Sequence, residues 1–293
     1  MDLKTFRDAL RQKDFVVTAD LPLQPTTAVS EIEGAVETLS GFVDALSVVD
    51  DREAVGHMSS LVAAGVVLRN DCDAIVHMTG RDRNRVALQA DLLGAAALGV
   101  TSLVITRGAK LSRKEHLRGK GVFDTHETRL MEMATRISEE SGLVTPPGFA
   151  VGTYVSAFAP AEDWVATRIS ENIDAGVSFL LTQPCLNKGM LKKYASKLVD
   201  LRVMHRASLL VEIPLLASAE IARNFKKNMP SALIPDGKIR GMAEADDQLE
   251  TGIELCAEML AGAREIPGVS GANIRYEGPP ELAVAALAAI GKS

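Results

Sequence analysis

The stretch that decides the fold is Ala74-Ile75-Val76-His77-Met78-Thr79-Gly80-Arg81-Asp82-Arg83-Asn84-Arg85. An apolar run ends in His77 and Thr79 and turns at once into a helix-periodic segment that begins near residue 84. A strand followed directly by a helix is the repeating unit of α/β proteins. Packing does not require ionisable groups at such a corner, whereas a site at the carboxyl end of a parallel strand does. The alternative is a capped helix start with a solvated arginine face.

The same alternation of apolar run and helical segment continues along the whole chain. Helical periodicity predicts helices over 27–41, 55–68, 84–98, 126–141, 161–175, 187–199, 218–228 and 246–263. Eight strand–helix units in a chain of this length predict one α/β domain over residues 1–293, a single (β/α)8 TIM barrel. A doubly wound open sheet is the main alternative. The predicted strands are Phe15–Leu21, Ala45–Val49, Ala74–Thr79, Ser102–Thr106, Phe149–Val155, Phe179–Gln183, Ser208–Ile213 and Gly271–Tyr276.

Composition narrows the class of protein. The 293 residues are 47% hydrophobic with a formal net charge of −6, so we expect no nucleic acid and no anionic membrane as partner. No apolar stretch reaches transmembrane length, and the first 14 residues lack the apolar run of a signal peptide. The three cysteines are far apart and have no zinc-site spacing, which favours a reduced, cytoplasmic protein without a metal.

Polar or ionisable side chains end all eight predicted strands. Each alone could be a solvent contact, but in a barrel they converge on one mouth, where a site is expected. The chain has no metal-ligand spacing, GxSxG, P-loop or GxGxxG, which disfavours metal-dependent or triad hydrolysis and phosphoryl transfer. Two long connections, 107–124 and 229–245, follow the fourth strand and the seventh helix, and the first is basic enough to cover an anionic ligand or to be a solvated loop. The strand-end residues are Asp20, Asp50 and Asp51, His77 with Thr79, Arg107, Tyr154, Gln183, Glu212, and Asn273 with Arg275.

Several of these motifs together resemble the methylenetetrahydrofolate reductase family over roughly residues 15 to 290. The His-Met-Thr-Gly-Arg-Asp block from His77 and the Asp-Ala-Gly to Thr-Gln block, 174–183, are fairly specific as a pair. They are joined by Leu98-Gly99-Val100, Val104-Ile105-Thr106-Arg107-Gly108, Ile213-Pro214-Leu215-Leu216-Ala217-Ser218 and Ile234-Pro235-Asp236.

The resemblance implies a TIM barrel that holds FAD at its carboxyl face. It also implies reduction of 5,10-methylenetetrahydrofolate to 5-methyltetrahydrofolate, with NADH or NADPH supplying hydride. Asp20 stands where the family has the glutamate that acts as acid, and Gln183 matches the residue that binds the pterin. Both are expected to bind substrate. The resemblance assigns the flavin to a further set of positions, which are His77, Thr79, Arg81, Asp82, Arg107 and Tyr154.

The chain departs from the family pattern at positions that surround the flavin. Ala109 replaces an aspartate, Asn172 a basic residue, and Val49 a threonine. Glu212 replaces a glycine and adds a carboxylate to the mouth, so it is a second candidate catalytic acid. Lys110, Arg113, Lys114, Arg118 and Lys120 could compensate by binding the pyrophosphate.

These departures leave three alternatives open. The first is a flavin-dependent reductase that works in either direction. The second is a flavin-free, tetrahydrofolate-dependent enzyme of the same fold, which transfers a methyl group or passes hydride directly and uses Glu212 as its acid. The third is a non-catalytic folate-binding subunit. In each case the predicted partner is a tetrahydrofolate derivative, and a homo-oligomer or a partner subunit is possible.

Overall fold

Eight parallel strands close into a barrel, with each strand hydrogen-bonded to its neighbours in chain order and β8 paired with β1. The computed structural model describes residues 5–50, 56–108, 120–140 and 147–290. The predicted TIM barrel is therefore confirmed, and the closed ring excludes the open sheet. Every strand lies within two residues of its predicted bounds. The strands are β1 Val16–Leu21, β2 Ala45–Val48, β3 Ala74–Thr79, β4 Ser102–Thr106, β5 Ala150–Val155, β6 Val177–Thr182, β7 Ser208–Pro214 and β8 Val269–Arg275.

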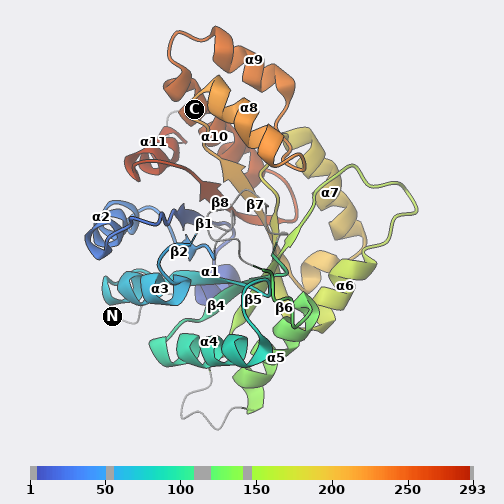
Figure 1. Ribbon diagram of the computed structural model, residues 1–293. Coiled ribbons are helices and arrows are strands. Elements are labelled where there is room, and N and C mark those ends of the chain that lie inside the picture. The colour runs from blue at the N-terminus through green and yellow to red at the C-terminus, as the bar shows by residue number, and fades with distance from the viewer. Residues whose placement is uncertain (1–4, 51–55, 109–119, 141–146, 291–293) are drawn as a thin grey trace.

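Helices surround the strands, as the view along the barrel in Figure 1 shows. They are α1 Phe6–Gln12, α2 Val29–Leu39, α3 Ser60–Arg69, α4 Arg85–Leu98, α5 Glu127–Glu140, α6 Thr167–Asp174, α7 Lys188–Asp200, α8 Ala219–Asn228, α9 Asp236–Glu244, α10 Gln248–Arg264 and α11 Glu281–Ala289, with a 3₁₀ turn at Val203–His205. Helix α10 packs on β7 and β8, so α8 and α9 are an insertion after β7. The prediction missed α1, α9 and α11.

Two predicted helices begin later than expected, and one of them is α3, which begins at Ser60 rather than at residue 55. We expected a helix from residue 161, whereas α6 begins at Thr167. The preceding segment is held as a loop because Trp164 packs edge-on against Phe158, with ring centroids 5.2 Å apart, and both rings lie near Tyr194 of α7.

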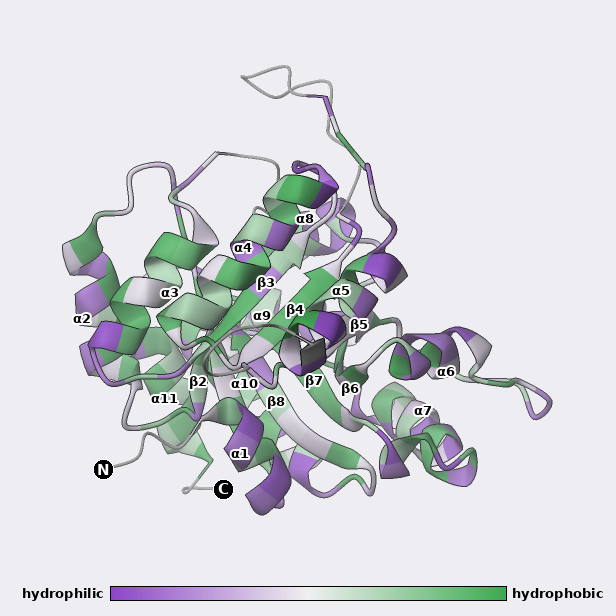
Figure 2. Cartoon of the chain, turned by 90° about the horizontal axis from the view of Figure 1, so that it is seen from below, coloured by the Kyte–Doolittle hydropathy of each residue, from purple (hydrophilic) through white to green (hydrophobic). Residues whose placement is uncertain are grey.

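The core has two parts, one outside the strands and one inside the barrel. The outer part packs helices against the strands, which in Figure 2 are largely hydrophobic at the centre of the molecule. The inner part fills the floor of the barrel with residues from seven strands and α1: Phe6, Ala9, Val16, Ala45, Ile75, Val104, Ala150, Phe179, Leu181 and Leu210. Because side chains alternate along a strand, the residues two and four places further on also point inward, at the carboxyl end.

Helix α1 closes the floor. Phe6 is fully buried and meets Phe179 edge-on, with ring centroids 5.3 Å apart. Gly152 makes room for the Phe179 ring, because a Cβ there would lie 2.2 Å from it. The backbone N–H of Phe6 donates to a carboxylate oxygen of Asp73 at 2.6 Å, and burial raises the pKa of that carboxyl group. In the described part of the chain, α1 thus covers the floor of the barrel.

In the described part of the chain, no helix is both long and apolar enough to cross a membrane.

The three cysteines are predicted to be unreactive in the folded protein. Burial raises the pKa of Cys72 and Cys185 to about 11 and that of Cys256 to about 12, and all three are free and buried. Because the thiolate is the nucleophile, a thiol-specific disulfide reagent at pH 8 should modify almost none of them in the native state. It should modify all three after denaturation. Rapid reaction of even one thiol in the native protein would contradict this packing.

Candidate functional site

The carboxyl end of the barrel is lined by polar side chains that point inward. Val16, at the floor, is followed on the same face by Thr18 and Asp20, and Ile75 is followed by His77 and Thr79. The same period brings in Ser47, Thr106, Tyr154, Gln183, Glu212, Asn273 and Arg275. Most of the strand-end residues predicted from the sequence therefore do converge on one mouth, whereas Arg107 is exposed and Asp51 lies outside the described residues.

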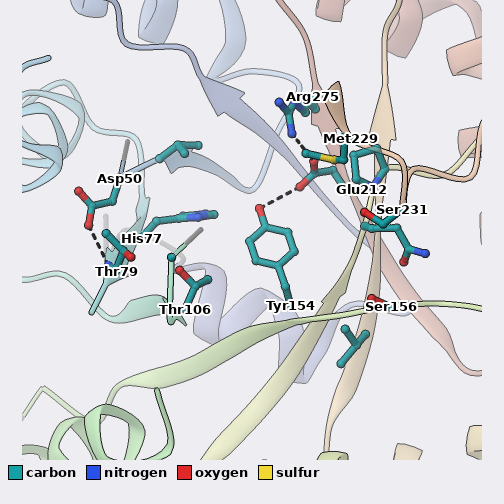
Figure 3. A pocket seen from close by; sticks show the side chains of 15 residues that line it. Asp50, His77, Thr79, Thr106, Tyr154, Ser156, Glu212, Met229, Ser231 and Arg275 are labelled. Atoms are coloured by element: carbon teal, nitrogen blue, oxygen red, sulfur yellow. Dashed lines mark hydrogen bonds and ion pairs between the residues drawn. The ribbon is translucent and has the colours of Figure 1, made fainter. Parts of the chain in front are cut away.

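Several of these side chains line a cavity of about 380 Å³, drawn in Figure 3. Its size is that of a site for a small organic ligand. Apolar and polar groups both contribute to its wall. The lining residues are Val49, Asp50, His77, Thr79, Thr106, Gly108, Tyr154, Val155, Ser156, Gln183, Pro184, Glu212, Met229, Ser231 and Arg275.

Glu212 is the buried carboxylate of the cavity, with only 1% of its surface exposed. The Tyr154 hydroxyl donates to its Oε2 at 2.9 Å, and Arg275 Nη1 donates to its Oε1 at 3.2 Å. Arg275 and Glu212 thus form an ion pair inside the barrel. Figure 3 shows both groups directed at Glu212, from β5 and from β8. A buried carboxylate held on two sides has a fixed orientation toward any ligand in the cavity.

The opposite wall is formed by the residues of β2 and β3. His77 Nε2 lies 2.6 Å from the Ser47 hydroxyl, and its ring centroid is 6.0 Å from that of Tyr154. Asp50 accepts a hydrogen bond at 2.8 Å from the backbone N–H of Thr79. The cavity is therefore bounded by an imidazole on one side and by the Glu212 carboxylate on the other, with Tyr154 between them.

Asp50 belongs to a network of charges beside the cavity. Burial raises the pKa of Asp50, although the neighbouring Arg83 guanidinium opposes that rise. Arg83 bonds to both Asp50 and Asp91. Its charge is thus shared between two protein carboxylates.

Gln183 lines the cavity, but its amide also holds the loop that follows β5. Its Oε1 accepts from the Ala157 backbone N–H at 2.6 Å, and its Nε2 donates to the Ala157 carbonyl at 2.8 Å. Gln183 and Ala157 are both buried. The side chain therefore fixes the loop backbone in addition to any contact with a ligand.

Replacing Gln183 with alanine is predicted to destabilise the protein and to weaken ligand binding. The change leaves the buried N–H and carbonyl of Ala157 without the amide, and each unsatisfied group costs about 1–3 kcal/mol. Urea unfolding should show the loss, and the dissociation constant of a ligand bound in the cavity should rise. Gln183→Glu should not rescue stability at neutral pH, because it sets a carboxylate oxygen against the buried Ala157 carbonyl. Equal stability of wild type and Gln183→Ala would refute the clamp.

Four of the predicted site residues are not among those that line the cavity. Asp20 is 3% exposed and accepts from Asn273 Nδ2 at 2.8 Å, and Asn273 in turn accepts from the Thr18 hydroxyl. Arg81 is buried and makes a bidentate pair with Asp82, both contacts being 2.7 Å. Arg107 is exposed and stacks over Phe123 at 5.4 Å.

The residues that depart from the family pattern lie in different places. Val49 lines the cavity, whereas Asn172 is buried on α6. Asp51, Ala109, Lys110, Arg113, Lys114 and Arg118 lie outside the described residues, and Lys120 is exposed.

The structure adds residues that the strand-end pattern did not select. Ser156 continues β5 by one step on the inward face, and Met229 and Ser231 come from the segment between α8 and α9. That segment runs beside the end of β6, where Leu233 N–H donates to the Pro184 carbonyl at 2.8 Å. Ser156 could have been found by extending the alternation. Nothing in the sequence indicates that 229–231 reaches the mouth.

Within the described ranges, no group of three or more His, Cys, Asp or Glu side chains could hold a metal ion.

The chain matches the model of one protein family. A family model described as methylenetetrahydrofolate reductase matches residues 6–270. A search of curated proteins found no match.

Solved structures show the same fold at low sequence identity. One is an uncharacterised protein from Clostridium thermocellum that binds two copies of 5-methyl-5,6,7,8-tetrahydrofolic acid. It is 12% identical with a TM-score of 0.68, and the match covers 99% of this chain and 98% of that one. Another is oxaloacetate acetylhydrolase in complex with 3,3-difluorooxalacetate, 14% identical with a TM-score of 0.55, covering 99% and 84% of the two chains.

Proposed function

The chain belongs to the methylenetetrahydrofolate reductase family, and from this premise we propose that it interconverts 5,10-methylenetetrahydrofolate and 5-methyltetrahydrofolate with NADH or NADPH as hydride carrier. The single observation that supports the proposal most is the buried Glu212 carboxylate, fixed by Tyr154 and Arg275 inside a cavity of about 380 Å³. The folate that binds to the similar Clostridium thermocellum protein is the ligand class that we assign to this cavity.

The cavity wall suits a pterin ring. Val49, Val155, Pro184 and Met229 offer apolar surface to the flat faces of the ring, and the polar groups fix its edge. Gln183 and Ser156 supply neutral donors and acceptors on the same wall. A mixed donor and acceptor edge is what the pterin presents.

Glu212 and Tyr154 are placed to transfer a proton to the folate and to stabilise the positive charge that forms on it. In the reductive direction the bond between the methylene carbon and N10 breaks, N10 takes up a proton, and the carbon becomes part of an iminium cation. The proton comes from solvent: Glu212 binds it transiently, and the Tyr154 hydroxyl hydrogen-bonded to Glu212 transfers it to N10. Once the proton has left, the buried Glu212 carboxylate stabilises the iminium cation. Hydride from the nicotinamide then converts the iminium carbon to a methyl group and leaves oxidised nicotinamide.

The described residues do not fit the diphosphate of FAD, the cofactor that the family resemblance implies. Three arginines beside the cavity are committed to protein carboxylates: Arg81 bonds to Asp82, Arg83 to Asp50 and Asp91, and Arg275 to Glu212. A fourth, Arg107, is exposed and stacks its guanidinium over the Phe123 ring. A resident dinucleotide must be held through many turnovers, so its diphosphate needs dedicated partners, usually arginine or a helix N-terminus.

NADH or NADPH requires fewer binding groups for its diphosphate than a resident FAD does. It leaves after each turnover, so it does not need dedicated cations to hold its diphosphate. We therefore derive no step through a flavin, and we place direct hydride transfer at the centre of the proposal. The flavin-dependent form of the reaction is the competing form, and flavin content distinguishes the two.

Turnover with defined components tests the proposal. Purified protein is incubated with 5,10-methylenetetrahydrofolate and NADH or NADPH, with and without added FAD. Oxidation of the nicotinamide is followed together with formation of 5-methyltetrahydrofolate. We expect turnover by a protein without a flavin absorption band. Turnover only in the presence of bound FAD would replace direct transfer with the flavin-dependent reaction. Folate binding without turnover in either direction would refute the oxidoreductase.

A further inference from the structure

Arg275 lies between the Glu212 carboxylate and an aromatic ring from the insertion after β7. Its guanidinium carbon is 4.8 Å from the centre of the Phe225 ring, while its Nη1 donates to Glu212. The side chain of Arg275 is 11% exposed, so it lies near the cavity mouth but is mostly shielded. A guanidinium stacked on a ring keeps its edge free for hydrogen bonds in the plane.

Phe225 belongs to the last turn of α8, and the same turn contributes to the cavity wall. The backbone N–H of Met229 donates to the Phe225 carbonyl at 2.8 Å, and the Met229 side chain lines the cavity. Met229, Phe225 and Arg275 are thus linked from the cavity wall to Glu212 through successive contacts. The carboxyl end of α8 therefore lies beside the site, and Met229, directly after the helix, lines the cavity.

We propose that Arg275 is a positioning residue for Glu212 and that Phe225 holds Arg275 in place. The proposal rests on the proposed function, because it assigns the orientation of the carboxylate used in that reaction. The two oxygens of Glu212 are aligned by partners on opposite sides, with Tyr154 on β5 and Arg275 on β8. Without the ring, the guanidinium can turn toward the open mouth, and the carboxylate then loses one of its two supports.

The test is steady-state kinetics of Phe225→Leu, Phe225→Tyr and Arg275→Lys. Leucine keeps apolar volume but removes the ring, and a cation–π contact of this kind corresponds to roughly three- to thirtyfold in rate. We expect Phe225→Leu to lower kcat by that factor with little change in KM. Phe225→Tyr keeps the ring, so its kcat should stay close to that of wild type. Arg275→Lys keeps the charge but not the planar fork, so it should lower kcat at least as much. An unchanged kcat in Phe225→Leu, with wild type active, would overturn the inference.

A stability cycle tests the same coupling if wild type proves inactive, so failure of the two proposals can be told apart. Urea unfolding is measured for wild type, Phe225→Leu, Glu212→Gln and the double variant. Because Phe225 acts on Glu212 through Arg275, the shift in the unfolding midpoint of the double variant should be smaller than the sum of the single shifts. Strictly additive shifts would overturn the positioning role, whatever the activity of the protein.

Discussion

Replacing Glu212 with glutamine is expected to lower kcat for folate conversion by about 10²- to 10⁴-fold, the usual contribution of general acid–base catalysis. Glutamine has nearly the same shape, so the cavity is kept. It cannot hold a proton or offset the iminium charge, and it leaves Arg275 without its carboxylate. Rapid-mixing or steady-state measurement of 5-methyltetrahydrofolate formation gives the number, and circular dichroism verifies that the barrel is intact.

Asp20→Asn is the matched comparison. Asp20 stands at the family's acid position, but its carboxylate bonds to Asn273 and is not among the residues that line the cavity. We therefore expect a smaller loss than in Glu212→Gln, and Tyr154→Phe should fall between the two because it removes one support and the proton path. Collapse of turnover in Asp20→Asn together with near-normal turnover in Glu212→Gln would contradict the assignment of Glu212.

Replacing Phe6 with alanine is expected to lower the free energy of unfolding by about 3–5 kcal/mol, the cost of truncating a buried phenylalanine. Phe6 is fully buried beneath the barrel and contacts the Phe179 ring. The Gly152 position admits the Phe179 ring, because a Cβ there would lie 2.2 Å from it. Chemical denaturation followed by circular dichroism measures the difference.

Leu10→Ala on the same helix is the control. Leu10 is only partly buried against the same inner cluster, so its truncation should cost clearly less than that of Phe6. If both changes lower the free energy of unfolding by the same small amount, α1 does not form the floor of the barrel.

Much of the barrel could be predicted because its strands are short apolar runs separated by helical periodicity. The missed helices each lack that signal. Helix α11 is almost entirely alanine and other apolar residues, so its sequence has no separate polar and apolar faces. Helix α9 begins directly after Pro235 and contains two glycines, which lower its helix propensity. Helix α1 has seven residues, too few for a periodicity to be recognised.

The sequence predicts which side chains lie at the mouth of the barrel, because the order of the strands determines their positions. His77, Thr79, Tyr154, Gln183 and Glu212 come together because inward residues at the ends of parallel strands meet at one mouth. What each side chain bonds to could not be predicted. The pairing of Arg81 with Asp82, the clamp of Gln183 on Ala157 and the contact of Phe225 with Arg275 depend on loops and on an insertion whose paths no periodicity specifies.

The most direct test of the central claim is a crystal structure of the protein with 5-methyltetrahydrofolate. We predict the pterin inside the barrel mouth, with its N5 side facing Glu212 and Tyr154 and with its ring against Met229 and Pro184. A folate bound elsewhere on the molecule, with the cavity empty, would contradict both the assignment of the cavity and the role of Glu212.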